Sequence, residues 1–249
     1  MYDETYFRNL EVRPGVMRPD FPAEQDRLIR KSDERLIELE RLRRPGRLLE
    51  IGCATGFLLE AARRRGWKVT GTDISAFAAK YAEKEFGVEV RVGTIPGLDM
   101  PKGSFDAVMA LEYIEHVPDP VETLRAVRQW IREDGVLMMS TPNAGSWTAR
   151  RHPDRFDGYL ERRHLVYFTR STMKLLLERS GFSLLDIRTD NALVTTDTLS
   201  AVGIRSPDRW RTLANRLAPG LKTWIRRAVG RAFGGPCMVV FATPKGSKS

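Results

Sequence analysis

The chain has 249 residues, of which 42% are hydrophobic and 29% charged, and this length and composition suit one folded α/β domain with a full core. No apolar run approaches the roughly 18 residues of a membrane-spanning helix, and the acidic, aromatic start lacks the pattern of a signal peptide. The two cysteines, Cys53 and Cys237, lie in neither CxxC nor His/Cys-cluster spacing. A disulfide framework and a structural zinc site are therefore not expected, and a cytoplasmic location is expected.

The first 44 residues are expected to form an aromatic arm followed by a helix. Residues 1–22 lack periodicity and combine prolines with aromatic side chains such as Tyr6. Residues 23–42 carry an apolar stripe at helical spacing, and Arg44-Pro45-Gly46 ends the helix. The arm either closes over a site as a lid, with Tyr6 against the substrate, or straps the surface with its aromatic side chains as anchors.

Residues 47–75 organise the rest of the chain, since they read as a strand, a glycine turn, a helix and a second strand. Gly52 and Gly56 let the backbone turn tightly and approach a ligand closely. The second strand, residues 68–72, delivers Asp73 to its carboxyl end, where its two oxygens could hold a ribose diol. Ligands of open parallel sheets bind in the crevice at this edge.

The glycine spacing of this turn distinguishes two classes of cofactor. A dinucleotide fingerprint, G-x-G-x-x-G, would need glycines where the chain has Ala54 and Phe57. Residues 50–56, EIGCATG, instead resemble the E/D-x-G-x-G-x-G loop of class I S-adenosylmethionine-dependent methyltransferases, with Ala54 replacing the middle glycine. Glu50 suits a cofactor that carries cationic groups and no phosphate. The alternative is a βαβ turn that binds no cofactor.

This resemblance implies S-adenosylmethionine as the cofactor, S-adenosylhomocysteine as its product, and a set of cofactor-binding residues. A third strand, residues 88–92, is followed by Thr94, at a position where related enzymes place an acid against the adenine amine. A fourth strand, residues 105–111, ends beside the methyl group. The implied cofactor-binding residues are Glu50, Gly52, Cys53, Ala54, Gly56, Phe57, Asp73, Ile74, Thr94, Leu111 and Glu112.

The segment after the fourth strand carries the second motif. Residues 115–120, EHVPDP, resemble the EHV-x-D/N-P segment of the small-molecule branch of these methyltransferases, which includes ubiquinone-type O-methyltransferases. His116 is a candidate general base, because an ordinary imidazole pKa of about 6.5 lets it accept a proton near neutral pH. Glu115 is the second candidate. Alternatively, His116 packs beside the cofactor and orders the loop.

A long stretch expected to be irregular, residues 143–168, follows a fifth strand at residues 135–141 and mixes aromatic with basic side chains. A loop of this length inside a compact domain usually has a function, such as closing over a substrate. The resemblance assigns this loop lid to the acceptor pocket, with His152, Tyr159 and His164 as substrate-binding candidates. For each histidine the alternative is a hydrogen bond within the loop.

A helix at residues 169–180 and strands at residues 182–189 and 237–244 complete the expected sheet, and residues 191–235 form an insertion between the last two strands. Residues 205–231 contain eight basic residues and one acidic residue, so this segment holds +7 of the net charge of +9. Tryptophans and leucines at helical spacing among basic residues fit helices on an anionic membrane surface, through residues 205–233. A helical lobe with a solvated basic face is the alternative, and RNA contact lacks a recognised module.

These features predict a Rossmann-like α/β three-layer sandwich over residues 45–249, with a seven-stranded, mostly parallel sheet and an antiparallel last strand. The resemblance implies a cytoplasmic enzyme, peripheral at the inner membrane face if the basic helices bind lipid. It would methylate a small-molecule acceptor at a hydroxyl oxygen, or next an amine, without metal or nucleic acid. The alternatives are a noncatalytic S-adenosylmethionine-binding or membrane scaffold protein and an RNA methyltransferase.

Overall fold

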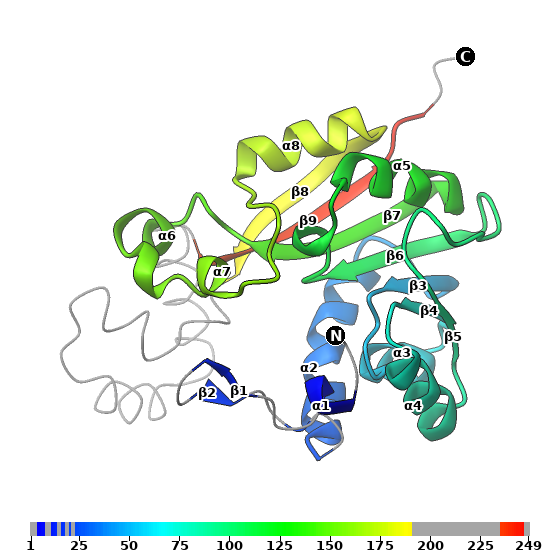
Figure 1. The fold of residues 1–249 in the computed structure, drawn as a ribbon. Helices are drawn as coiled ribbons and strands as arrows, with labels where there is room; N and C mark the ends of the chain where they lie inside the picture. The colour runs from blue at the N-terminus through cyan, green and yellow to red at the C-terminus, as the bar shows by residue number, and fades with distance from the viewer. Residues whose placement is uncertain are drawn as a thin grey trace, which may run out of the picture.

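A seven-stranded sheet forms the centre of the computed structural model, which describes residues 4–7, 11–13, 16–17, 20, 23–190 and 235–246 (Figure 1). The spatial order of the strands is β5-β4-β3-β6-β7-β9-β8. Their bounds are β3 Arg47–Ile51, β4 Lys68–Asp73, β5 Glu89–Val92, β6 Phe105–Leu111, β7 Ile131–Pro142, β8 Phe182–Asp190 and β9 Cys237–Pro244. All neighbours from β5 to β7 are parallel, whereas β9 is antiparallel to both β7 and β8. The predicted Rossmann-like sheet with an antiparallel last strand is confirmed.

Helices cover both faces of the sheet and make the three layers (Figure 1). Helices α2 (Gln25–Glu40), α3 (Phe57–Arg64) and α4 (Ala76–Phe86) pack on one face, where Leu36, Leu59 and Ala82 are buried in one apolar cluster. Helices α5 (Pro120–Trp130) and α8 (Arg170–Arg179) pack on the other face around Val127 and Met173. The apolar stripes that predict these helices are thus the faces that they bury.

Side-chain caps fix the starts of three of these helices. Ser75 accepts a hydrogen bond from the amide of Ala78, and Asp119 accepts one from the amide of Glu122. Thr169 forms a capping box with Thr172. Each cap supplies an acceptor to an amide that has no partner within its helix, so the sequence locates these starts to within a residue.

Two segments expected to be irregular contain short elements. The N-terminal arm includes α1 (Glu4–Phe7) and a hairpin of β1 (Glu11–Arg13) and β2 (Val16–Met17). The loop lid contains α6 (Trp147–Arg151), the 3₁₀ helix η2 (Pro153–Arg155) and α7 (Asp157–Leu160). Elements this short lack the periodicity from which the longer helices are predicted, and tertiary contacts such as the ring of Phe7 against Phe77 hold them.

The predicted basic insertion, residues 191–235, lies outside the described residues except for Gly235. Its membrane-binding segment, residues 205–233, lies outside them completely. Among the residues that the structure describes, no helix is both long and apolar enough to span a bilayer.

Candidate active site

The turn that follows β3 is bound to the end of β4 by backbone hydrogen bonds. The amides of Gly52 and Cys53 both donate to the carbonyl of Thr72, at 2.8 and 3.0 Å. Gly52 and Gly56 have φ of +69° and +81°, and Ala54 has the same left-handed sign at +48°. Glycine adopts such angles with the least strain, so all three positions favour glycine for backbone reasons, and the chain has glycine at two of them.

The Asp73 carboxylate lies between the turn and the start of α4. Its Oδ2 accepts the amide proton of Ala54 and its Oδ1 that of Ser75, both at 2.8 Å. Burial raises the pKa of Asp73, and these amide hydrogen bonds oppose the rise. A carboxylate has about four acceptor positions, so two oxygens that each accept one amide can still accept from a diol.

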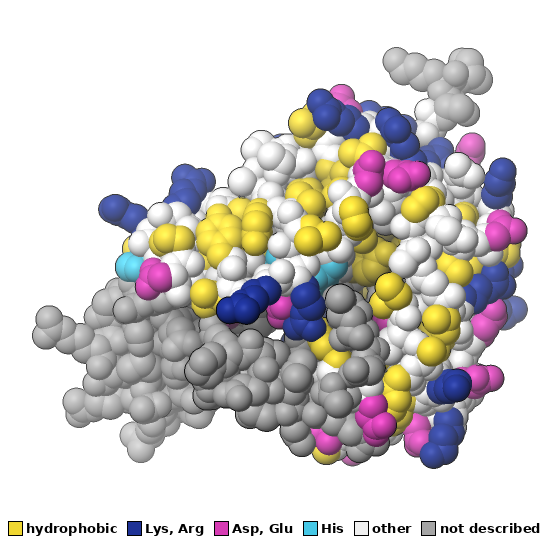
Figure 2. Space-filling model, viewed as in Figure 1, with side chains coloured by type: hydrophobic (Ala, Val, Ile, Leu, Met, Phe, Trp, Pro, Cys, Tyr) yellow, Lys and Arg dark blue, Asp and Glu magenta, His cyan; other side chains and the backbone are white. Residues whose placement is uncertain are grey.

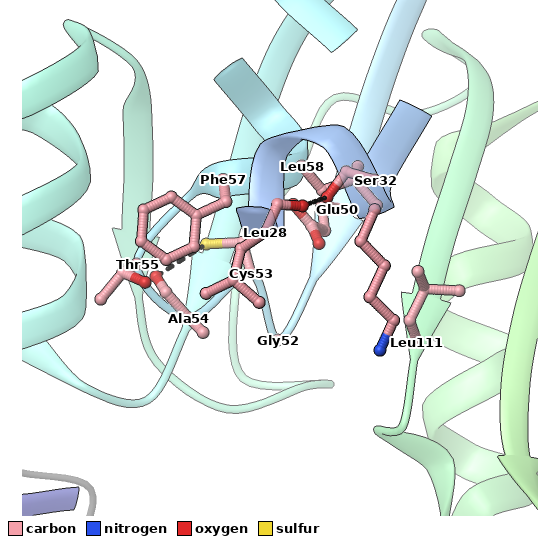
Figure 3. A pocket seen from close by; sticks show the side chains of 11 residues that line it. Leu28, Ser32, Glu50, Gly52, Cys53, Ala54, Thr55, Phe57, Leu58 and Leu111 are labelled. Atoms are coloured by element: carbon pink, nitrogen blue, oxygen red, sulfur yellow. Dashed lines mark hydrogen bonds between the residues drawn. The ribbon is translucent and has the colours of Figure 1, made fainter. Parts of the chain in front are cut away.

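A cavity of about 200 Å³ lies beside this turn, between it and α2 (Figure 3). The end of β3 and the turn contribute Glu50, Cys53 and Ala54 to its lining, and α2 contributes Leu28 and Ser32 (Figure 3). Its lining residues are Leu28, Lys31, Ser32, Glu50, Gly52, Cys53, Ala54, Thr55, Phe57, Leu58 and Leu111. Six of these are predicted cofactor-binding residues, while α2 contributes three that the sequence does not single out.

Glu50 is the charged group most deeply placed in this cavity. Only 6% of the residue is exposed, and its Oε2 has no hydrogen-bond partner among the described residues. Burial, and then the nearby charge of Asp73, raise the pKa of Glu50 well above its ordinary value. A buried carboxylate without a partner is costly, so this atom is the acceptor that a cationic ligand would satisfy.

Ile74, Thr94, Glu112 and Gly56 are predicted cofactor residues that do not line the cavity. Ile74 and Thr94 are exposed at the ends of β4 and β5, and the Glu112 carboxylate accepts the hydroxyl proton of Ser140 at 2.7 Å. Gly56 contacts α4, because a Cβ placed on it would lie 2.7 Å from the Cβ of Ala82. Phe57 lines the cavity and also packs edge-on against Tyr81 and Phe86.

Tyr113 is a neighbour of the turn that the sequence does not single out. A Cβ placed on Gly52 would meet the Tyr113 ring at 2.7 Å, so the ring lies directly over the glycine. Burial and the charge of Asp73 raise the pKa of Tyr113 to about 12. Its position between the fourth strand and the second motif is the feature that could have indicated a place beside the turn.

A second cluster forms where the 3₁₀ helix η1 (Ile114–His116), which follows β6, meets the lid. The rings of His116 and His164 lie 4.7 Å apart, and His164 Nε2 lies 3.9 Å from Glu115 Oε1. Glu115 is 1% exposed, and neither of its carboxylate oxygens has a hydrogen-bond partner among the described residues. The structure therefore brings together both candidate catalytic residues and one candidate substrate-binding residue.

Burial shifts the pKa of both catalytic candidates toward their neutral forms. Burial and then the charge of Glu112 raise the pKa of Glu115 to about 8. Burial is also the main cause that lowers the pKa of His116, with the charges of His164 and Arg163 in the same direction. At neutral pH the site thus holds a neutral imidazole beside a protonated carboxyl group.

Backbone carbonyls of the lid fix the tautomers of both histidines. Nδ1 of His116 lies 3.0 Å from the carbonyl oxygen of Arg163, and Nδ1 of His164 lies 2.7 Å from that of Gly158. A carbonyl oxygen can only accept, so each Nδ1 carries a proton, and the neutral ring of His116 keeps its lone pair on Nε2. Glu115, His116 and His164 also offer donor atoms within 4.8 Å of one another, which a metal ion could use.

The remaining substrate-binding candidates lie on the lid and the N-terminal arm. His152 packs against Trp147, with ring centroids 5.0 Å apart, and Tyr159 lies edge-on to Tyr167 at 5.0 Å. Tyr6 lies on the guanidinium of Arg163, 4.7 Å from its carbon to the ring centroid. Figure 2 shows hydrophobic side chains gathered where Figure 1 places the lid and α8, and exposed lid residues include Tyr159, Leu160, Leu165 and Tyr167.

Comparisons with known proteins show the family and the fold of the chain. A family model described as a methyltransferase domain matches residues 23–187. The ubiquinone biosynthesis O-methyltransferase of Xanthomonas campestris pv. campestris (strain B100) is 40% identical over 106 residues, which are 40% of this chain and 44% of that protein. The chain thus spans less than half the length of this curated relative.

Solved structures share the fold at low sequence identity. A SAM-dependent methyltransferase from Archaeoglobus fulgidus has a TM-score of 0.58 at 20% identity, over 90% of this chain and 98% of that one. A phosphoethanolamine N-methyltransferase 2 of Haemonchus contortus, in complex with S-adenosyl-L-methionine, has a TM-score of 0.56 at 18% identity. The match covers 86% of this chain and 52% of that one. The resemblance to class I S-adenosylmethionine-dependent methyltransferases drawn from the sequence is confirmed.

Proposed function

Because the chain belongs to the methyltransferase domain family, we propose that it transfers a methyl group from S-adenosylmethionine to a hydroxyl oxygen of a small molecule. S-adenosylhomocysteine is the product, and an amine is the next candidate acceptor. The observation that carries the proposal is the buried Glu50 Oε2, an acceptor without a partner in a cavity that Lys31 also lines. A dinucleotide would bring phosphates toward this carboxylate, whereas a methionyl group brings an ammonium.

The cavity and its rim fit the charged groups of this cofactor one by one. Glu50 would hold the ammonium, Lys31 the carboxylate, and Asp73 the ribose hydroxyls. When bound, S-adenosylmethionine supplies a methyl group activated by a sulfonium. Gly52 carries no side chain, which lets the Tyr113 ring pack directly on the turn beside the proposed cofactor site.

His116 is the proposed general base for the acceptor. Its lowered pKa keeps the imidazole neutral at pH 7, and its Nδ1–H tautomer leaves the Nε2 lone pair to accept the hydroxyl proton. Glu115 is the alternative base, although its pKa of about 8 makes it mostly protonated at pH 7. Lid residues His152, Tyr159 and His164, with Tyr6 from the arm, are the proposed acceptor contacts.

Residues 205–233, which lie outside the described residues, are proposed to bind an anionic membrane, and the cytoplasm is the proposed setting. The N-terminal arm at residues 1–44 and the methyltransferase domain at residues 45–249 are the proposed units. Sedimentation with anionic and neutral liposomes tests the membrane proposal. Binding to neither kind of vesicle would contradict it.

Calorimetry with S-adenosylhomocysteine, followed by incubation with methyl-labelled S-adenosylmethionine, tests the function. Separate panels of phenols, aliphatic alcohols, amines and RNA serve as acceptors. We expect binding, label on a hydroxyl compound, and a loss of turnover of about 10²–10⁴-fold in His116→Gln with binding retained. Absence of binding would contradict the proposal, binding without labelling of any panel would favour a noncatalytic binding protein, and labelled RNA would favour an RNA methyltransferase.

A further inference from the structure

Arg163 contacts the proposed base with its backbone and the N-terminal arm with its side chain. Its carbonyl oxygen accepts the Nδ1 proton of His116 at 3.0 Å. Its guanidinium pairs with both carboxylate oxygens of Glu161, at 2.8 and 2.9 Å, and lies on the ring of Tyr6. The orientation of this one residue therefore links the arm to the imidazole of His116.

The lid is held against η1 just beyond Arg163. The carbonyl of Glu115 accepts the amide protons of Leu165 and Val166, at 2.8 and 3.2 Å. The backbone on both sides of Arg163 is bonded to Glu161, because the amide of Arg163 donates to Glu161 Oε1 at 3.3 Å and the amide of His164 donates to the carbonyl of Glu161 at 3.1 Å. The Arg163 side chain, of which 25% is exposed, adds its contacts with Glu161 and Tyr6.

Tyr6 is in turn fixed on the body of the protein. Its ring lies edge-on to Phe7, with centroids 4.8 Å apart. Phe7 is 1% exposed and stacks on Phe77 of α4 at 5.8 Å. Short helix α1 thus reaches from α4 to the lid, and an arginine on an aromatic face is a favourable contact.

We propose that Tyr6 and Arg163 are positioning residues that fix His116 as the Nδ1–H tautomer. The carbonyl of Arg163 selects which ring nitrogen carries the proton, and the contact with Tyr6 holds that carbonyl in place. The catalytic meaning of this arrangement rests on the proposed function, because Nε2 is then the nitrogen that accepts the hydroxyl proton. The tautomer itself does not depend on that function.

Nitrogen NMR of the full chain with ¹⁵N-labelled histidine, without ligand and at a pH where His116 is neutral, reads the tautomer directly. The chain has only three histidines, so single substitutions assign every signal. We expect a protonated Nδ1 and an unprotonated Nε2 for His116 in the wild type. In Tyr6→Ala and Arg163→Ala the two nitrogens of His116 should shift toward the opposite tautomer.

Matched variants and the other histidines are the controls. Tyr6→Phe keeps the aromatic face and Arg162→Ala removes a neighbouring exposed cation, so both should keep the wild-type His116 signals. His164, held by Gly158, should be unchanged in all variants and report an intact lid. Unchanged His116 signals in Tyr6→Ala and Arg163→Ala would overturn the proposal. If Arg163→Ala alters all three histidines, the comparison of Tyr6→Ala with Tyr6→Phe decides in the same way.

Kinetics separate this inference from the proposed function. With the tautomer shifted, kcat of Tyr6→Ala should fall by about tenfold, part of the 10²–10⁴ that a general base contributes, while the KM for S-adenosylmethionine stays the same. A shifted tautomer with full activity would leave the positioning role standing and contradict His116 as the base. An unshifted tautomer with reduced activity would overturn the positioning role alone.

Discussion

The carboxylate of Asp73, at the end of β4, accepts the amide proton of Ala54 in the turn after β3, at 2.8 Å. Two neighbouring strands are therefore joined at the edge where the cofactor is proposed to bind. The second oxygen of Asp73 accepts the amide proton of Ser75, so each carboxylate oxygen already accepts one backbone hydrogen bond. The same residue thus shapes the turn and would present acceptors to the proposed ligand.

Replacing Asp73 with Asn should weaken both the fold and ligand binding. The amide nitrogen of Asn would face the amide of Ala54 or of Ser75, which leaves a buried donor unpaired at a cost of about 1–3 kcal/mol in the free energy of unfolding. Urea unfolding and calorimetry with S-adenosylhomocysteine measure the two effects. The exposed Asp99→Asn is the control, and equal behaviour of the two variants would contradict the role of Asp73.

Lys31 and Glu50 should recognise different ends of the methionyl group. We expect Lys31→Ala to weaken the binding of S-adenosylhomocysteine by about tenfold or more. The binding of its decarboxylated analogue, which lacks the carboxylate, should not change. Glu50→Gln should weaken both of these ligands, which carry the ammonium. Neither variant should affect 5′-methylthioadenosine, and Lys80→Ala on α4 should affect none of the three. A Lys31→Ala variant that weakens all three ligands equally would contradict the assignment.

Alanine substitutions at Gly56 and Gly87 should distinguish the cost of backbone strain from the cost of steric overlap. Both have left-handed φ, of +81° and +64°, so alanine at either position costs about 1–2 kcal/mol. A Cβ on Gly56 would also lie 2.7 Å from the Cβ of Ala82, whereas one on Gly87 has nothing within 4 Å. Urea unfolding should therefore show Gly56→Ala less stable than Gly87→Ala by about 1–3 kcal/mol. Equal losses would mean that α3 and α4 move apart at no cost.

The stability of the protein should depend on the protonation of Glu115. Its pKa is about 8 in the folded chain against an ordinary value of 4.5, so the folded state holds a proton that the unfolded state releases between these values. Wild-type stability therefore falls as pH rises through this window, by up to about 1.4 kcal/mol per pH unit from this group. Glu115→Gln has no such group, so its stability relative to wild type should rise from pH 5 to 8.

Urea unfolding at several pH values between 5 and 9 measures this difference. The exposed Glu133→Gln should show a difference from wild type that stays constant with pH. A constant difference for Glu115→Gln as well would show that the carboxyl group is charged in the folded protein.

The acidic limb of the activity profile should reflect the lowered pKa of His116. Burial, with the charges of His164 and Arg163, disfavours the imidazolium, while the Arg163 carbonyl and Glu161 oppose this. We therefore expect kcat/KM for the acceptor to fall with a midpoint below about 6.5. His164→Gln removes one neighbouring charge and should move the midpoint upward. Assays with EDTA exclude a contribution from metal at these side chains, and a midpoint at or above 6.5 would contradict the assignment.

Much of the fold is predictable because its determinants are local. The apolar runs of the seven strands, the caps at Ser75 and Asp119, and the glycine turn each depend on a few neighbouring residues. The place of Lys31 is not predictable in this way. In the sequence it belongs to the polar face of an amphipathic helix, and only the packing of α2 against α3 shows that it lines the cavity. The sequence likewise cannot show that the path of the lid brings His164 to Glu115, or that Tyr6 reaches Arg163.

The register of β8 and β9 has a consequence for engineering the chain. Asp190, the last residue of β8, pairs directly with Cys237, the first residue of β9, and Pro236 and Gly235 accept hydrogen bonds from Asn143. The two points where the intervening segment leaves and rejoins the sheet are thus adjacent. A short link could replace residues 191–234, keep Gly235 and Pro236 as the partners of Asn143 and close the same hairpin, so that the proposed lipid binding could be tested apart from the proposed catalysis.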